Sequence, residues 1–399
     1  PVSALIHAAT MVTAGVYLLA RMLPLISASS VALAAIAVTG GVTAFYGASC
    51  ALAQRDLKRV LAYSTISQIG YMVLGVGCSA VAAATFHLFV HAFFKALLFL
   101  GAGCLITACQ HEQDIFRMRV DRRSIPLTFW PFLAGAVCLA GLPPTGGFFS
   151  KDAILAAVWE KGGALYGGLY LLALLTALLT AIYTFRLLYL LFGGETMRNV
   201  PHLQKVELAT PIASKIPRSM EATLLPLALI ALFAGILNLP SYFGAGLIDG
   251  FLGSPAIGKE AKTLVEPLEA LLMGIAGMVA FAGLLIAYIR YGGARREARL
   301  ATAALPPSRM TVFLLHGWYL DDIYCFIFVR PYEKLARFLW KWCDEWVIDD
   351  SLDRLAAFLG SSGEWMGRWA TGRVSLYLLS FATGLAALLG YLALVIYGT

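Results

Sequence analysis

The chain has 399 residues, of which 60% are hydrophobic and 13% are charged, and its formal net charge is +7. Soluble domains carry about 25% charged residues, so the composition excludes an ordinary soluble protein and indicates an all-α polytopic membrane protein. The seven cysteines form no CxxC pair, and GxGxxG and Walker A motifs are absent from the sequence, so it offers no iron–sulfur, zinc or nucleotide site of its own.

Long apolar runs predict about nine membrane-spanning helices, each of about 20 residues or more. They cover residues 2–23, 31–53, 59–78, 81–109, 125–160, 165–192, 221–240, 266–291 and 373–397. The chain begins at Pro1, inside an apolar run and without a signal-peptide pattern. We therefore expect it to be the C-terminal part of a longer protein.

Positive charge alternates between the loops that join these helices. The loops at 54–59, 110–124 and 193–220 and the stretch after residue 291 carry an excess of Lys and Arg, whereas the intervening loops are uncharged, balanced or nearly so. The positive-inside rule places the first set in the cytoplasm. The net positive charge thus points to membrane topology and lipid headgroups rather than to nucleic acid.

His87, His91 and Lys95 stand four residues apart in the fourth segment. Steps of four place them on one stripe of a helix. Each ionisable group at membrane depth costs about 2.5–3.5 kcal/mol on insertion scales, so three together favour a proton or ion path. The alternative is that both histidines are neutral packing residues and Lys95 extends to the surface. Ser64, Thr65, Ser67 and Gln68 give the preceding helix a polar face that holds water or bonds to other helices.

The fifth segment is too long for one span, and residues 141–147 interrupt it with two prolines and three glycines. This pattern predicts one broken helix, and irregular backbone inside a membrane is tolerated only where protein or a water-filled cavity lines it. Lys151 and Asp152 follow the break directly. A lysine there faces carbonyls freed by the break and can release and regain a proton. The alternative is a salt-bridged end of the half-helix.

Two further charged or titratable residues lie inside apolar helices. His7 is a lone histidine, and it is a relay candidate only if its helix adjoins the helix that carries His87. Arg186 lies close to a cytoplasmic helix end, where we expect its side chain to extend to the surface. Lys58 and Arg59 are expected to be charges at the membrane interface.

Residues 318–368 mix Trp, Tyr and charged residues and are too polar to span. Leu335, Leu339, Trp342 and Trp346 follow one helical face, which predicts a long interfacial amphipathic helix before the last span. Residues 360–363 are expected to bend or break it. The helix either anchors the terminal span or braces neighbouring subunits laterally.

Several motifs together resemble the antiporter-like subunits of NADH:quinone oxidoreductase (respiratory complex I). PVSALIHAATMVTAG at 1–15 resembles the signature of these subunits, and DLKRVLAYSTISQIG at 56–70 is similar to a segment of the wider family, which includes Mrp-type sodium/proton antiporters. HLFVHAFFKALLF at 87–99, HEQDIF at 111–116 and GFFSKD at 147–152 resemble the subunit L group, called chain 5 in mitochondria. The resemblance covers essentially the whole chain.

The resemblance implies roles for six residues of a proton relay. Lys151 matches the lysine of the second broken helix at the proton exit, and Asp152 matches its acidic neighbour. Lys95 matches the central connecting lysine, and His87 and His91 match the histidines between. His7 matches the histidine of the preceding half-channel.

The resemblance also implies a division of the chain. Residues 1–30 hold the last helix of an upstream repeat, 31–192 a second five-helix antiporter-like repeat, 193–310 two additional spans with their loops, 311–372 the lateral helix and 373–399 the anchor helix. The first repeat, with its glutamate–lysine pair, would lie upstream.

The sequence thus predicts a proton-translocating subunit in a multi-pass membrane location, most simply the bacterial cytoplasmic membrane, with an organellar inner membrane as the alternative. We expect no cofactor in this chain; NAD, FMN, iron–sulfur clusters and quinone would belong to partner subunits. Expected partners are the other membrane-arm subunits, above all the neighbouring antiporter-like subunits, together with the lipid bilayer and protons, and no nucleic acid. The alternatives are a subunit of an Mrp-type antiporter or a membrane-bound hydrogenase, or a purely structural anchor.

Overall fold

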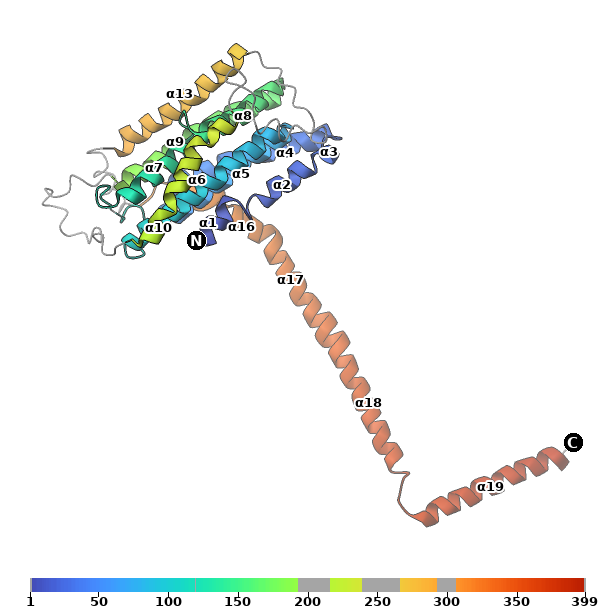
Figure 1. Ribbon diagram of the computed structural model, residues 1–399. Helices are drawn as coiled ribbons and strands as arrows, with labels where there is room; N and C mark the ends of the chain where they lie inside the picture. Colours follow the sequence, from blue (N-terminus) through green and yellow to red (C-terminus); the bar gives the residue numbers. More distant parts are fainter. Residues whose placement is uncertain (1, 119, 193–215, 239–265, 293–305, 398–399) are drawn as a thin grey trace. The chain divides into compact units, whose positions relative to one another are not determined.

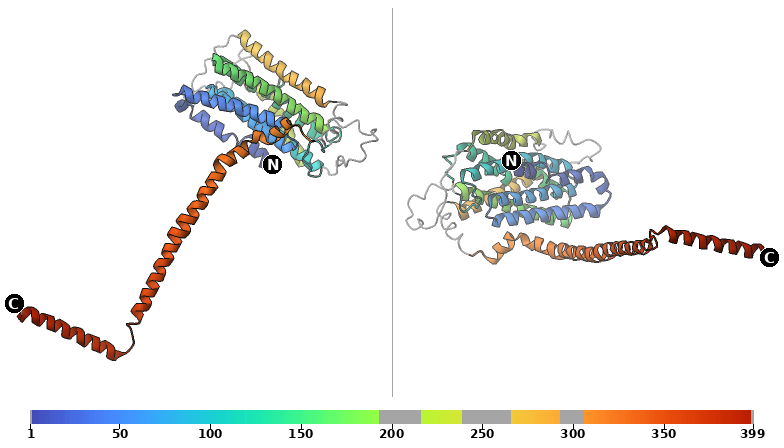
Figure 2. Two further views of the ribbon diagram at one scale, coloured as in Figure 1. Left: turned by 180° about the vertical axis from the view of Figure 1, so that it is seen from behind. Right: turned by 90° about the horizontal axis from the view of Figure 1, so that it is seen from below.

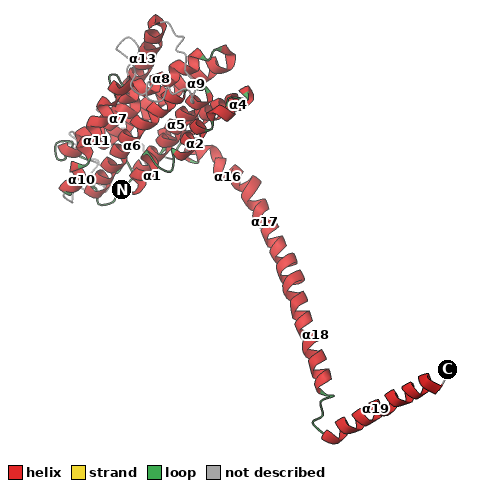
Figure 3. Ribbon diagram, turned by 45° about the vertical axis from the view of Figure 1, so that its right-hand side comes forward, coloured by secondary structure: helices red, strands yellow, loops and turns green. Residues whose placement is uncertain are grey.

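The computed structural model describes residues 2–118, 120–192, 216–238, 266–292 and 306–397. In these ranges the chain is built from helices, and the only β pairing is an isolated bridge between Asp56 and Asp114 (Figure 3). Seven helices within them are long and apolar enough to cross a membrane. The expected all-α polytopic membrane architecture is confirmed. The chain divides into two compact units, 1–318 and 319–399.

The first unit is a bundle of helices (Figure 1). Its elements are α1 (Val2–Ala8), α2 (Ala14–Arg21), α3 (Leu23–Ile26), α4 (Ser30–Ala53), α5 (Leu57–Gly77), α6 (Val81–Ala108), α7 (Pro126–Ala140), α8 (Gly146–Glu160), α9 (Gly163–Phe192), α10 (Arg218–Ala222), α11 (Leu224–Phe233), η3 (Ala234–Asn238), α13 (Glu266–Tyr291) and α15 (Arg309–Leu315). Each predicted span before residue 292 corresponds to helical residues. Most of the loops at 193–220 and 241–265, and the basic stretch after residue 292, lie outside the described residues.

The first predicted span is not one continuous helix. α1 ends at Ala8 and α2 begins at Ala14. The hydroxyl of Thr10 donates to the carbonyl of Leu5 (2.9 Å) and that of Thr13 to the carbonyl of Ala9 (2.8 Å). Threonine hydroxyls compete in this way with the helical hydrogen-bond ladder. Thr180 makes the same kind of bond to Thr176 inside the continuous helix α9, so these bonds do not by themselves end a helix, and no Pro or Gly marks the break between Ala8 and Ala14.

α4 and α5 pack backbone against backbone. A Cβ atom added to Gly40 would lie 2.3 Å from the Leu74 nitrogen, and one added to Gly70 would lie 2.4 Å from the Ala44 nitrogen. Small residues at such positions let membrane helices approach closely. The close contact fixes the position of α5, whose polar face is buried inside the bundle.

The fifth predicted span is broken, as the sequence predicts. α7 ends at Ala140, Gly141 adopts a left-handed conformation with φ of 72°, and α8 begins at Gly146. Gly147 packs so closely on α7 that an added Cβ would lie 1.9 Å from the Cys138 carbonyl oxygen. Glycine is required there because no side chain fits between the two half-helices.

α13 runs alongside α9 in the same direction. The rings of Tyr288 and Tyr189 lie 5.8 Å apart. Gly283 packs against Ala181, so that a Cβ added to Gly283 would lie 2.6 Å from the Ala181 Cβ. Nearer the starts of the two helices, Leu272 and Tyr170 share one hydrophobic cluster. The first turns of α9 and α13 therefore lie at one end of the bundle, where α8 also ends.

The second unit is one long helical run followed by a last span. Helical turns continue without interruption through α16 (Leu320–Tyr324), η6 (Cys325–Val329), α17 (Arg330–Leu339), η7 (Trp340–Asp349) and α18 (Asp350–Gly367), and α19 (Val374–Tyr397) follows (Figure 2). The bend expected at 360–363 is wrong, because these residues lie inside α18. Glycine in a helix costs about 1 kcal/mol and does not by itself end it.

Candidate functional site

Five of the six predicted relay residues are buried in the first unit. His87, His91 and Lys95 are 0% exposed, Lys151 is 4% and Asp152 is 7% exposed. Burial of so many ionisable groups is costly, and in membrane proteins such groups mark functional pathways. Lys95 lies in the middle of α6 and does not extend to the surface, so that alternative is wrong for this residue.

Lys95 is held by α5. Its Nζ donates to the Leu61 carbonyl oxygen (3.0 Å) and to the Ser64 hydroxyl. Ser64 in turn donates to the same carbonyl (2.8 Å). The polar face predicted for this helix therefore bonds between helices at Lys95.

His87 is held one turn further along α5. Its Nε2 lies 3.0 Å from Gln68 Oε1, and its Nδ1 lies 2.9 Å from the Ser150 hydroxyl of α8. Ser150 Oγ also lies 3.4 Å from the Gly147 carbonyl oxygen. Because a hydroxyl can donate or accept, Ser150 can donate to a neutral His87, or accept from a protonated one while donating to Gly147.

Lys151 is held by the helix break. Its Nζ donates to the Leu139 carbonyl oxygen (3.2 Å) and lies 5.4 Å from the centre of the Tyr71 ring. The helical partner of Leu139 would be residue 143, which is a proline and has no N–H to give. The prediction that this lysine faces a carbonyl freed by the break is confirmed.

His91 and His7 lie near the break between α1 and α2. His91 Nδ1 lies 3.1 Å from the carbonyl oxygen of Ala8, the last residue of α1, and its buried Nε2 has no hydrogen-bond partner among the described residues. His7 stacks on Phe99 of α6, with ring centroids 4.9 Å apart. α1 therefore adjoins α6, the helix that carries His87. His7 was a relay candidate only if these two helices adjoin, and this condition is met.

Asp152 follows Lys151 directly in α8. Its Oδ1 is buried and has no hydrogen-bond partner among the described residues. Its charge interacts with that of Glu269 on α13 and with Tyr170 on α9. The alternative, a salt-bridged end of the half-helix, is not found among the described residues, since neither Lys151 nor Asp152 is in any of their ion pairs.

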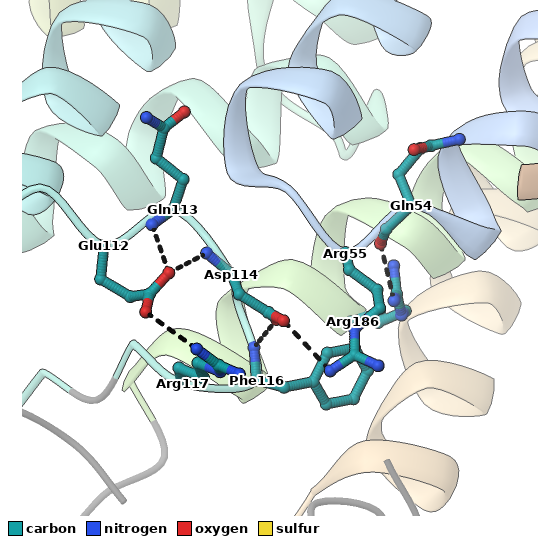
Figure 4. Close-up of polar contacts among 8 residues, drawn as sticks. All are labelled: Gln54, Arg55, Glu112, Gln113, Asp114, Phe116, Arg117 and Arg186. Carbon is teal, nitrogen blue, oxygen red and sulfur yellow. Dashed lines mark hydrogen bonds and ion pairs between the residues drawn. The ribbon is translucent and has the colours of Figure 1, made fainter. Parts of the chain in front are cut away.

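Arg186 corrects one expectation from the sequence. It is 3% exposed and does not extend to the surface. Its guanidinium donates to the carbonyl of Gln54 (2.9 Å) and lies 5.6 Å from the centre of the Phe116 ring. The HEQDIF segment at 111–116 packs near the C-terminal part of α9, where Phe116 covers the Arg186 guanidinium (Figure 4). Lys58 and Arg59 are exposed, as expected for interface charges.

Six residues thus form what we call the polar row: Lys95, Ser64, Gln68, His87, Ser150 and Lys151. It links α6 through α5 to the second half of the broken helix. Sequence reasoning missed Ser150 and Tyr71. Ser150 had a signal, since it adjoins Lys151, but its contact with His87 spans 63 positions. The row offers successive proton-binding groups, and the described residues contain no group of three or more His, Cys, Asp or Glu side chains placed to hold a metal ion.

Comparisons with known proteins agree with this architecture. Residues 1–183 match the family model described as NADH:quinone oxidoreductase/Mrp antiporter, TM. The chain is 39% identical over 395 residues to NADH-quinone oxidoreductase subunit L of Pseudomonas aeruginosa, covering 99% of this chain and 59% of that protein. It is 39% identical over 340 residues to the subunit of the same name of Escherichia coli, covering 85% of this chain and 51% of that protein.

A solved structure shares the fold. The Mrp complex from a Dietzia species matches with a TM-score of 0.53 and 27% sequence identity, over 89% of this chain and 38% of the matched chain. The chain spans about half to three-fifths of the length of the two curated relatives. Residues 1–183 thus match the membrane family shared by NADH:quinone oxidoreductases and Mrp antiporters, and the chain as a whole is similar to part of the NADH-quinone oxidoreductase subunit L proteins.

Proposed function

We propose that this chain works in a proton-translocating membrane subunit of an NADH:quinone oxidoreductase, an enzyme of the translocase class. The observation that carries the proposal is the polar row, in which hydrogen bonds join Lys95 to Ser64 and His87 to Gln68 and Ser150, with Gln68 one helical turn after Ser64 and Lys151 next to Ser150 in the chain. Electron transfer would take place elsewhere in the complex and would drive charge changes along the row.

In the proposed mechanism, protons pass from the centre of the membrane to Lys151. Lys95, held by Leu61 and Ser64, takes up a proton from the side of His7 and His91. His87 receives it next, and rotation of the Ser150 hydroxyl keeps both forms of the imidazole hydrogen-bonded. Lys151 then holds the charge against the Leu139 carbonyl oxygen.

The two broken helices fit this role. Each presents a freed carbonyl to a titratable side chain: Ala8 to His91 and Leu139 to Lys151. Discontinuous helices provide such binding groups in transporters. We infer that residues 31–192 form the five-helix unit of the relay, and that the additional spans at 193–310 and the anchor at 373–399 support it.

The partners in this proposal are the other membrane-arm subunits, since the homologous proteins are named as subunits of a quinone-reducing complex. NAD, FMN, iron–sulfur clusters and quinone would be bound by those other subunits. The protein is an integral multi-pass membrane protein, and the bacterial cytoplasmic membrane is the proposed location.

For the long helix of the second unit we propose a lateral role. Its apolar residues are exposed within their own unit, for example Leu335, Leu339 and Trp342 at 56%, 46% and 51%. A helix with such a face and a charged opposite face lies at an interface. Residues 311–372 would then run along neighbouring subunits and the lipid headgroups.

An Mrp-type cation/proton antiporter or a membrane-bound hydrogenase subunit is the second candidate, favoured by the structural similarity to the Mrp complex. Sodium-dependent transport without NADH oxidation would support it.

The test of the relay is substitution of both lysines in the assembled complex. Lys95→Ala and Lys151→Ala are expected to reduce proton pumping in proteoliposomes while the complex still assembles. Unchanged pumping in both variants would contradict the relay.

A further inference from the structure

The aromatic ring of Tyr71 on α5 faces the side chain of Lys151 on α8. Lys151 Nζ lies over this ring, 5.4 Å from its centre. Both side chains are buried, Tyr71 at 0% and Lys151 at 4% exposed. A cation within about 6 Å of a ring centre is attracted by the electron-rich face of the ring, and the attraction is stronger where water is excluded. The ring therefore attracts Lys151 as an ammonium and not as a neutral amine.

Few other groups compensate the charge of the Lys151 ammonium. Its one hydrogen-bond acceptor among the described residues is the Leu139 carbonyl oxygen, at 3.2 Å, and it is in none of their ion pairs. On another side it meets the backbone of Gly141, where an added Cβ would lie 3.7 Å from Nζ. Because a charged group at membrane depth is costly, the ring face and the single carbonyl share the compensation of this charge.

The Tyr71 ring is held in place from both of its ends. Its hydroxyl donates to the Ala173 carbonyl oxygen of α9, at 2.6 Å. The residue before it, Gly70, packs so closely on α4 that an added Cβ would lie 2.4 Å from the Ala44 nitrogen. The backbone and the hydroxyl of Tyr71 are therefore both tied to neighbouring helices, and the ring cannot turn away from Lys151 without breaking one of these contacts.

We propose that the Tyr71 ring is a cation seat, which holds the Lys151 side chain at the helix break while that side chain carries a proton. This inference rests on the proposed function. In the protonated state, the ring and the Leu139 carbonyl hold Nζ between α5 and α7. When the proton leaves, the attraction to the ring ends and the amine is free to turn away. Tyr71 is a positioning residue, because its hydroxyl is bound to Ala173 and takes no part in proton transfer.

A buried ring beside a lysine can also serve only to fill space. The two roles differ in how they depend on the charge distribution of the ring, because packing needs its shape whereas cation binding needs its electron-rich face. Fluorine atoms withdraw electron density from that face and weaken its attraction for a cation, while the ring keeps nearly the same shape. Fluorination therefore separates a cation seat from a packing residue.

The decisive comparison is between Tyr71→Phe and trifluorophenylalanine at the same position, in the full subunit within the purified complex in proteoliposomes. Tyr71→Phe keeps the ring face and is expected to retain most proton pumping per NADH oxidised. Trifluorophenylalanine at position 71 is expected to lower pumping about tenfold, as is Tyr71→Leu, which is the size of a desolvated cation–π contact. The matched control is Phe132, which is 0% exposed and packs near the Phe192 ring. Trifluorophenylalanine at position 132 is expected to pump as wild type.

Equal pumping with phenylalanine and trifluorophenylalanine at position 71, together with poor pumping in Lys151→Met, would refute the cation seat and leave the relay intact. Wild-type pumping in Lys151→Met would instead contradict the proposed function. Equal losses on fluorination at positions 71 and 132 would also overturn the seat, because fluorine would then act through packing alone. If Tyr71→Phe does not assemble, fluorinated tyrosine at position 71 keeps the hydroxyl bond to Ala173 and decides by the same comparison with wild type.

Discussion

The Nδ1 atom of His87 and the Oγ atom of Ser150 lie 2.9 Å apart and join α6 to the second half of the broken helix. Ser150 is the residue before Lys151, so this contact connects the histidine stripe to the lysine at the break. The same hydroxyl reaches the Gly147 carbonyl oxygen, at 3.4 Å. One rotating hydroxyl thus serves both protonation states of His87.

Ser150→Ala is expected to reduce proton pumping several-fold, because His87 Nδ1 then has no partner that can change from donor to acceptor. The cost in stability is expected to be small, about 1 kcal/mol for one hydrogen bond. Ser49→Ala is the control, since Ser49 is buried and donates to the carbonyl of Tyr46 within its own helix. Equal pumping rates in the two variants would rule out a role for the Ser150 hydroxyl.

Gly147→Ala is expected to destabilise the break. The added Cβ would lie 1.9 Å from the Cys138 carbonyl oxygen, so the half-helices must move apart. Overpacking of this kind costs about 1–3 kcal/mol or more. Thermal unfolding should show a lower midpoint than for Gly103→Ala, whose added Cβ meets no atom within 4 Å. If both variants melt at the same temperature, the close packing at Gly147 has no energetic importance.

Arg186→Ala is expected to weaken the bundle end drawn in Figure 4. It removes a hydrogen bond to the Gln54 carbonyl oxygen and the contact with the Phe116 ring, and it leaves a buried carbonyl without its partner. An unpaired buried acceptor costs about 1–3 kcal/mol. The amount of folded protein in detergent, followed by thermal melting, should fall relative to Arg59→Ala, which changes an exposed charge. A melting curve indistinguishable from that control would argue against a stabilising role for the Arg186 contacts.

The order of the loop at residues 111–117 is expected to depend on pH. The backbone N–H groups of Asp114 and Gln113 donate to Glu112, at 2.9 and 2.8 Å, and Arg117 lies nearby. The Asp114 hydrogen bond is the largest cause that lowers the pKa of Glu112 below its usual 4.5, followed by the Gln113 bond and Arg117. Because the pKa of Glu112 is lower in the folded state than in the unfolded state, its carboxylate contributes stability at pH values above the unfolded-state pKa. That stability is lost as the pH falls through the folded-state pKa.

Acid titration of loop order therefore tests Glu112. Wild type is expected to lose protection of the loop amides, followed by hydrogen exchange, as the pH falls below about 4.5. Glu112→Gln should show a flatter profile over that range. An unchanged acid limb in the variant would mean that another group controls the loop.

The sequence predicted most of the helices because apolar runs of spanning length are unambiguous, and it predicted the break at 141–147 because proline and glycine cannot continue a helix there. The break after Ala8 was missed because no glycine or proline marks it before Ala14. The bend at 360–363 was wrongly predicted from glycines that the helix tolerates. Local propensity alone does not decide such cases.

In the candidate site, too, the sequence predicted some features and missed others. Periodicity placed His87, His91 and Lys95 on one stripe, and all three are buried together. Their partners, however, come from three other helices, and pairings such as His87 with Gln68 and Ser150 depend on tertiary packing that the sequence pattern does not contain. The burial of Arg186 was missed for the same reason, since the segment that covers it lies in a separate loop.

The measurement that tests the central claim most directly is proton pumping per NADH oxidised in proteoliposomes, compared between Lys151→Met and Lys161→Met. Lys151 is buried at the break, whereas Lys161 is exposed at the end of the same half-helix. The polar row predicts a clear loss of pumping in Lys151→Met, with the complex assembled, and wild-type pumping in Lys161→Met. Wild-type pumping in an assembled Lys151→Met complex would contradict the relay.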